Sequence, residues 1–225
     1  SDWVLPIHAG PEIGVASTKA FIGQLLALYI LSLKISIIRE DISQKFYKKS
    51  ITDLKKIPDA IKESLKLENK IQTMAKEFAD AKGSMFLGRG SSFPIALEGA
   101  LKLKELSYLH AEGYPAGEMK HGPLALIEEG LPVIIIAPKD KYFEKTLSNM
   151  QEVISRGGKI FFITDNKKDI SNDNIRFGLR VPFLNNLLSP ILLTVPLQLL
   201  AYHVAFLKNC DIDKPRNLAK SVTVE

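Results

Sequence analysis

The chain has 225 residues, of which 46% are hydrophobic and 24% are charged, the composition of an ordinary globular protein with one or two compact domains. Its net charge of +5 is spread over scattered lysines, without the aromatic and basic interleaving of a nucleic-acid surface, so a nucleic-acid partner is not expected. Its single cysteine excludes an internal disulfide and predicts a cytoplasmic protein.

The first fifty residues predict one long apolar helix, at 21–38, between a glycine-proline turn and a lysine-rich connector. One helix and a loop cannot bury a core of their own, so residues 1–50 are expected to be the remnant of a preceding domain. A second apolar stretch runs over 187–207. Polar residues and prolines interrupt both stretches, which predicts core helices rather than membrane spans, and no signal peptide pattern opens the chain.

After the connector, strand and helix patterns alternate. We expect a linking helix over 51–74, a complete domain over 75–215 and an extended tail over 216–225. The elements predicted in detail are a helix at 71–81, a strand at 84–87, a helix from Pro94, a strand at 133–137, a helix at 142–156, strands at 160–164 and 175–181, and a helix ending near 208. This alternation predicts an α/β fold with a doubly wound parallel sheet, helices on both faces and a ligand crevice at the carboxyl ends of the strands.

The turn between the first strand and its helix, residues 88–92, combines two glycines, an arginine and two serines. Backbone N–H groups at such a turn are directed at an anion, so one interpretation is a phosphate or oxyanion site with Arg89 adding positive charge. The other is a turn that serves only chain geometry. Phe93 stands where the dinucleotide fingerprint needs a third glycine, so that fingerprint is absent.

The helix that follows carries Glu98, Lys102 and Glu105 within an arc of about 60°, on an otherwise mostly apolar circumference. Charges on a buried helix must be paired or must line a cavity. A carboxylate beside a partly desolvated ammonium is a means of tuning a general acid or base. The alternative is an intrahelical pair of Glu98 with Lys102 that only stabilises the helix.

A loop histidine, His121, lies between a lysine and a glycine-proline turn, close in sequence to the charged stripe. A loop position on a rigid scaffold suits proton transfer, although a structural role is the alternative. The other histidines, His8, His110 and His203, have no comparable surroundings. No pair of histidines has the spacing of metal ligands, so neither a metal site nor a cofactor is expected.

Three segments carry a resemblance to a known family: HAGPEIGVASTKAF at the start, FLGRGSSFPIALEGALKLKELSYLHAEGYPAGEMKHGPLAL in the middle and LQLLAYHVAFLKNCDIDKPRNLAKSVTVE at the end. Together they resemble the isomerase half of the glutamine:fructose-6-phosphate amidotransferase (glucosamine-6-phosphate synthase) family. That half contains two flavodoxin-like sugar isomerase (SIS) domains preceded by a glutaminase domain. The resemblance implies that residues 1–50 end the first SIS domain, that 75–215 form the complete second one and that 216–225 are a catalytic tail.

The resemblance also implies residue roles. Lys220 would form a Schiff base with the open-chain keto sugar, and Glu105 would transfer a proton between C1 and C2. Lys102 and Glu98 would support that step, and His121, contributed by the neighbouring subunit of a homodimer, would assist ring opening. The implied substrate contacts are Glu12, Val15, Ser17 and Ala219.

The expected function is therefore conversion of fructose 6-phosphate to glucosamine 6-phosphate, with ammonia derived from glutamine. In the family the principal phosphate loop and the glutaminase lie outside the segment matched here, so this chain alone is expected to bind sugar phosphate weakly and to turn over slowly. The alternative is a noncatalytic sugar-phosphate-binding or dimerisation module. A nucleic-acid binder, the third hypothesis, would require steeply salt-dependent affinity.

Overall fold

The computed structural model describes residues 2–166 and 173–220, so residues 221–225 of the predicted tail lie outside the described part. The α-helices are α1 Lys19–Ile38, α2 Gln44–Leu54, α3 Ile57–Leu65, α4 Glu68–Ala79, α5 Ser92–Ser107, α6 Phe143–Ile154 and α7 Ser189–Leu207. The strands are β1 Gly83–Gly88, β2 His110–Pro115, β3 Pro132–Ile136, β4 Lys159–Thr164 and β5 Ile175–Arg180. Two 3₁₀ helices, η1 Ala116–His121 and η2 Pro123–Leu126, follow β2.

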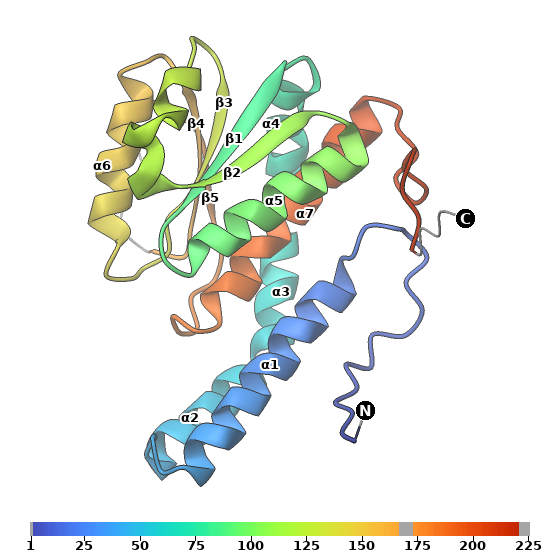
Figure 1. Ribbon diagram of the computed structural model, residues 1–225, viewed down its shortest axis with the longest axis vertical. Helices are drawn as coiled ribbons and strands as arrows, with labels where there is room; N and C mark the ends of the chain where they lie inside the picture. Colours follow the sequence, from blue (N-terminus) through green and yellow to red (C-terminus); the bar gives the residue numbers. More distant parts are fainter. Residues whose placement is uncertain (1, 167–172, 221–225) are drawn as a thin grey trace.

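The strands form one parallel sheet in the order β2-β1-β3-β4-β5 (Figure 1). This is the flavodoxin-like order, in which β2 is added on one side of β1 and the later strands are added on the other side. Helices α4, α5 and α7 pack on one face of the sheet, and α6 with η1 packs on the other. The predicted doubly wound α/β fold is confirmed.

The central strands show why the sheet is covered on both sides. In β3 every residue is buried. Ile134 and Ile136 belong to the core beneath α5 and α7, whereas Val133 and Ile135 belong to the core beneath α6. Because successive side chains of a strand point to opposite faces, a continuous apolar run is stable only between two helical layers.

The edge strand β2 is absent from the sequence-based prediction. Its sequence, HAEGYP, contains a glycine and a proline and no β-branched residue, so it lacks the composition of a strand. It forms because β1 offers a complete parallel ladder, in register from Gly83 opposite His110 to Gly88 opposite Pro115. Tertiary pairing decides this element.

The connecting region also differs from the prediction. Residues 51–74 do not form one linking helix but are divided between the end of α2, the whole of α3 and the first part of α4. Pro58, in the first turn of α3, explains one break, because proline is tolerated at a helix start and not in its interior.

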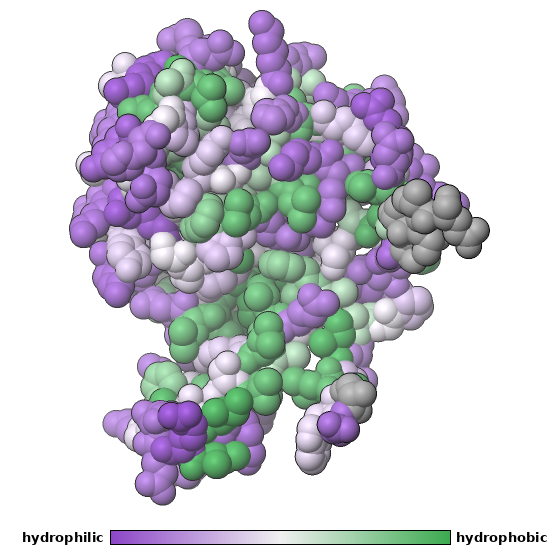
Figure 2. Space-filling model, viewed as in Figure 1, coloured by the Kyte–Doolittle hydropathy of each residue, from purple (hydrophilic) through white to green (hydrophobic). Residues whose placement is uncertain are grey.

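Two helices of the described chain, α1 and α7, are long and apolar enough to cross a membrane by length and composition alone. As predicted, α7 is a core helix, packed against α4 and α5. The same prediction for α1 is wrong: only Leu33 of this fully described helix is buried, because α1 packs against other elements on one side only. Figure 2 shows hydrophobic side chains gathered over α1. The large exposed ones are Leu28, Ile30, Leu31, Ile35 and Ile38.

The close contact between β2 and α5 yields a first prediction. A Cβ atom added to Gly113 would lie 2.8 Å from the backbone nitrogen of Leu97 in α5, so Gly113→Ala must push the helix and the edge strand apart. We expect it to lower the free energy of unfolding by about 1–3 kcal/mol, measured by urea denaturation. The control is Gly23→Ala in α1, where the nearest atom is Cβ of Ile7, at 3.3 Å. An equal loss of stability in both variants would contradict the role assigned to Gly113.

Candidate functional site

The charged stripe of α5 forms an ion triad around a buried lysine. Lys102 is only 5% exposed, and its Nζ lies 2.5 Å from Oε2 of Glu105 and 3.8 Å from Oε1 of Glu98. A lysine this deeply buried is stable as an ammonium only because two carboxylates share its charge. The sequence therefore placed the three charges correctly, but the apolar positions Leu97 and Leu101 of the same helix are exposed rather than buried.

The two carboxylates of the triad are not equivalent. Burial raises the pKa of Glu98 above its ordinary value; the attraction of Lys102 opposes this shift and the repulsion of Glu105 adds to it. Oε1 of Glu98 is buried and accepts no hydrogen bond from the described atoms. Glu105, by contrast, keeps the short contact with Lys102 and is 22% exposed. Glu105 is thus the more exposed carboxylate of the triad.

Lys102, the central member of the triad, lines a cavity of about 320 Å³, a size suited to a small ligand. The cavity lies between α5, α7, the loop that precedes α1 and the segment that follows α7. Its walls are Glu12, Gly14, Ala16, Thr18, Leu65, Lys102, Leu106, Val195, Gln198, Leu199, Tyr202, Ile212 and Asp213. The cavity therefore joins parts of the chain that are up to two hundred residues apart in sequence.

The loop before α1 is held in place by Glu12. Its Oε1 accepts hydrogen bonds from the backbone N–H groups of Thr18, at 2.9 Å, and Ala20, at 3.3 Å, and so caps α1, whose N-cap side chain makes no capping hydrogen bond of its own. Burial opposes ionisation of Glu12, but these two backbone bonds and the nearby ammonium of Lys220 outweigh it and lower the pKa of the carboxyl. Glu12 is thus an anion at neutral pH.

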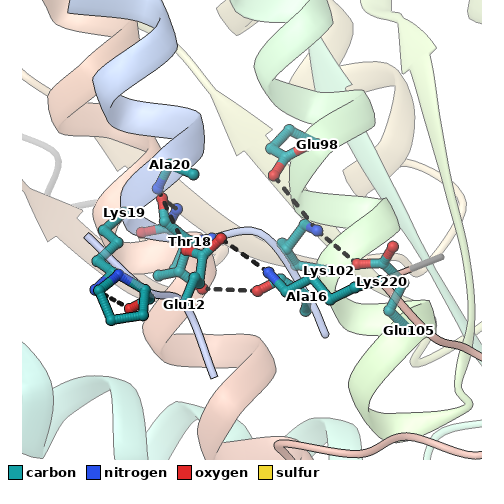
Figure 3. A network of polar contacts seen from close by, with 11 residues as sticks. Glu12, Ala16, Thr18, Lys19, Ala20, Glu98, Lys102, Glu105 and Lys220 are labelled. Atoms are coloured by element: carbon teal, nitrogen blue, oxygen red, sulfur yellow. Dashed lines mark hydrogen bonds and ion pairs between the residues drawn. The ribbon is translucent and has the colours of Figure 1, made fainter. Parts of the chain in front are cut away.

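The second oxygen of Glu12 contacts Lys220. Its Oε2 lies 3.2 Å from Nζ of Lys220, in the tail that follows α7 (Figure 3). The N–H of Val15 donates to the backbone oxygen of Asp213, at 2.9 Å, and joins the same two segments again. Figure 3 shows the Glu12–Lys220 pair beside the Glu98–Lys102–Glu105 triad. Two lysine amines and three carboxylates thus lie together, with Glu12 and Lys102 in the cavity wall.

The other predicted site residues are Val15, Ser17, Ala219 and His121, and not all of them are close to the cavity. Val15 and Ser17 are half-buried in the loop before α1, and Ala219 is exposed next to Lys220. His121 is not brought to the cavity: its side chain is 63% exposed, its Nε2 lies 3.9 Å from Glu118, and the η1 segment that carries it packs against α6.

The glycine-serine turn does not line the cavity either, which instead meets the C-terminal half of α5. The crevice predicted at this turn is therefore not where the structure places the cavity. Arg89 donates to Oδ1 of Asn149, at 2.7 Å, in place of the anion contact considered above. A Cβ at Gly88 would lie 2.3 Å from the backbone oxygen of Ser92, so this glycine is required by the tight strand-to-helix turn.

Several cavity residues escaped the sequence analysis. Thr18 follows the predicted contact residue Ser17 directly, so the loop pattern could have included it. Asp213 stands in the sequence Asp-Ile-Asp-Lys-Pro, a recognisable turn pattern in which Asp211 accepts the N–H groups of residues 213 and 214. Gln198 is an isolated polar residue in the apolar helix α7. Within residues 2–166 and 173–220, no group of three His, Cys, Asp or Glu residues is arranged to hold a metal ion.

Comparison with known proteins identifies the fold and the family. Residues 77–208 match the SIS domain family. The glutamine–fructose-6-phosphate aminotransferase (isomerizing) of Bartonella quintana is 50% identical over 226 residues, which cover 100% of this chain and 37% of the relative. That of Mesorhizobium japonicum is 52% identical over 227 residues, with the same shares.

A solved structure agrees with the sequence relatives. The C-terminal domain of glucosamine-fructose-6-phosphate aminotransferase from Francisella tularensis superposes with a TM-score of 0.88 and 45% identity, over 91% of this chain and 58% of that one. This chain thus spans little more than a third of the curated relatives' length. The chain belongs to the SIS domain family, and its predicted resemblance to the isomerase half of the glutamine:fructose-6-phosphate amidotransferases is confirmed.

Proposed function

We propose that this chain is the isomerase part of an enzyme that converts fructose 6-phosphate and ammonia to glucosamine 6-phosphate. One observation carries the proposal: a single cavity has Glu12 and Lys102 in its wall, with Lys220 in contact with the first and Glu105 with the second. A nucleophilic amine and an accessible carboxylate are the two groups that a keto-to-amino-aldose conversion needs. The names of the curated relatives point to the same reaction.

The proposed steps use these groups in order. The amine of Lys220, once it leaves Glu12 and loses its proton, adds to the C2 carbonyl of the open-chain sugar, and water departs to leave an imine. Ammonia then replaces the lysine at C2. Glu105 takes a proton from C1 and returns it to C2, while the C1 hydroxyl proton passes to the imine nitrogen, which yields a 2-amino aldose.

The remaining triad members assist Glu105 in this proposal. Lys102 orients the Glu105 carboxylate through the 2.5 Å contact. Glu98 lies farther from the ammonium, at 3.8 Å, and leaves the closer contact to Glu105. Glu12, Val15, Ser17 and Ala219 are proposed to contact the sugar.

His121 is proposed to assist ring opening from the neighbouring subunit of a homodimer. Its exposure, and its place beside α6 rather than at the cavity of its own chain, support an action across a subunit interface. A histidine at the surface of one subunit can reach a ligand bound by another without any rearrangement of its own fold.

The domain organisation is likewise a proposal. Residues 1–50 would end a preceding SIS domain, 51–74 would link it to the SIS domain at 75–215, and 216–225 would be the catalytic tail. The exposed apolar side of α1 and the greater length of the relatives support this division. The principal phosphate loop and the glutaminase would then belong to preceding parts of a cytoplasmic enzyme.

A noncatalytic sugar-phosphate-binding or dimerisation module is the second candidate. The ion pair of Lys220 with Glu12 favours it, because a paired ammonium is not a nucleophile. The two candidates differ in whether the lysine becomes covalently attached to sugar.

The first test is trapping of that attachment. With fructose 6-phosphate and borohydride, we expect reduction of the imine to a stable adduct on Lys220, detected by peptide mass spectrometry. Lys220→Arg should abolish it, because a guanidinium forms no imine, whereas Lys214→Arg, an exposed lysine of the same segment, should not. No adduct at saturating sugar phosphate would favour the noncatalytic module.

A second test separates imine formation from proton transfer. Glu105→Gln should retain the borohydride adduct but reduce deuterium exchange at C1 by roughly 10²–10⁴-fold, since the amide cannot accept the proton. Exchange at C1 in deuterated water, followed by NMR, measures this step. Exchange at the wild-type rate would rule out Glu105 as the base.

The third test concerns the pH dependence of stability. Because the pKa of Glu98 is raised in the folded chain, its ionisation destabilises the fold as pH rises from the ordinary value of 4.5 through the raised one. We expect Glu98→Gln to become progressively more stable than the wild type over that range, as measured by urea denaturation at several pH values. The same substitution at exposed Glu63 separates this effect from the general loss of a carboxylate. A stability difference that shrinks with rising pH would contradict the sign.

A further inference from the structure

The segment that carries Lys220 is attached to the end of α5 by Tyr108. The hydroxyl oxygen of Tyr108 accepts the backbone N–H of Arg216, at 2.8 Å. The guanidinium carbon of Arg216 lies 4.1 Å from the centre of the Tyr108 ring, within the range of a cation–π contact. One side chain thus holds both the backbone and the side chain of Arg216.

Tyr108 ends α5 in a left-handed backbone conformation, at a position where glycine is the usual residue. Its φ is 58° and its ψ is 13°, and its N–H donates to the oxygen of Lys104. Glycine adopts this conformation without steric cost, whereas a bulky side chain does not. Ending the helix therefore does not explain the tyrosine, but its two contacts with Arg216 do.

The position of this attachment matters for the cavity. Tyr108 lies three residues after Glu105 on the same helix, and Arg216 lies four residues before Lys220. Four residues span at most about 14 Å, so an anchored Arg216 confines Lys220 to the vicinity of α5. Lys220 itself is paired with Glu12, and this ion pair must break before the amine can react.

We propose that Tyr108 is a positioning residue for Lys220. It keeps the tail near the α5 carboxylates while the amine is released from Glu12. The lysine amine then samples a smaller volume than it would on an unattached tail. This inference rests on the proposed function, in which Lys220 is the nucleophile. Tyr108 itself touches neither the sugar nor the reacting atoms in this role.

The test uses Tyr108→Gly and Tyr108→Phe in the full-length protein. Tyr108→Gly removes both contacts but suits the left-handed backbone, so we expect an unchanged or higher melting temperature. Hydrogen exchange at the Arg216 amide should rise about tenfold, and the rate of borohydride-trapped adduct at saturating fructose 6-phosphate should fall about tenfold. Tyr108→Phe, which keeps the ring and loses the acceptor, should give intermediate values for both.

The matched control is Glu40→Gly, because Glu40 is also a non-glycine residue with a left-handed backbone, φ 61°, but lies in the turn between α1 and α2. It should leave Arg216 exchange and the adduct rate unchanged. A purely structural tyrosine would instead lower the melting temperature of Tyr108→Gly, and the adduct rate would follow the folded fraction.

The outcomes separate the two proposals. If the wild type forms no adduct, the proposed function fails, whatever the exchange data show. If the wild type forms the adduct but Tyr108→Gly matches it in adduct rate or in Arg216 exchange, the positioning role is overturned and the function stands.

Discussion

The buried ammonium of Lys102 is the interaction on which the site depends. It lies on a helix packed against the sheet and α7, where an unpaired charge would be costly, and the spacing along the helix places both Glu98 and Glu105 beside it. Lys102 lies in the cavity wall, and Leu97 and Leu101 of the same helix are at the surface. Pairing within one helix thus lets α5 carry a buried charge at the cavity wall.

A second carboxylate, Glu12, connects the two ends of the chain. One oxygen caps α1 and the other binds Lys220, so the loop before the first helix and the tail after the last one share a single anion. The pKa of Glu12 is lowered by these donors, which keeps the link intact at neutral pH. The cavity wall is thus built from segments near both ends of the described chain.

The parts of the fold that sequence could predict are those with strong local patterns. Continuous apolar strands such as β3 and the amphipathic helix α6 were predicted within a residue or two of their observed bounds. The edge strand β2 was missed because its partner β1, not its composition, makes it a strand. The exposure of α1 was not predicted, because the hydropathy of a helix shows that its side chains could be buried but not whether other elements of the chain cover them.

The sequence by itself determined the fold class, the family and the alignment of three charges on one helix, because these follow from local periodicity and from long matching segments. Only the tertiary structure decided that the cavity adjoins the C-terminal half of α5 rather than the glycine-serine turn, that Lys220 contacts Glu12, and that Tyr108 holds the tail. These contacts join residues more than one hundred positions apart. Such distant pairings depend on how packed elements meet in space, which local patterns do not encode.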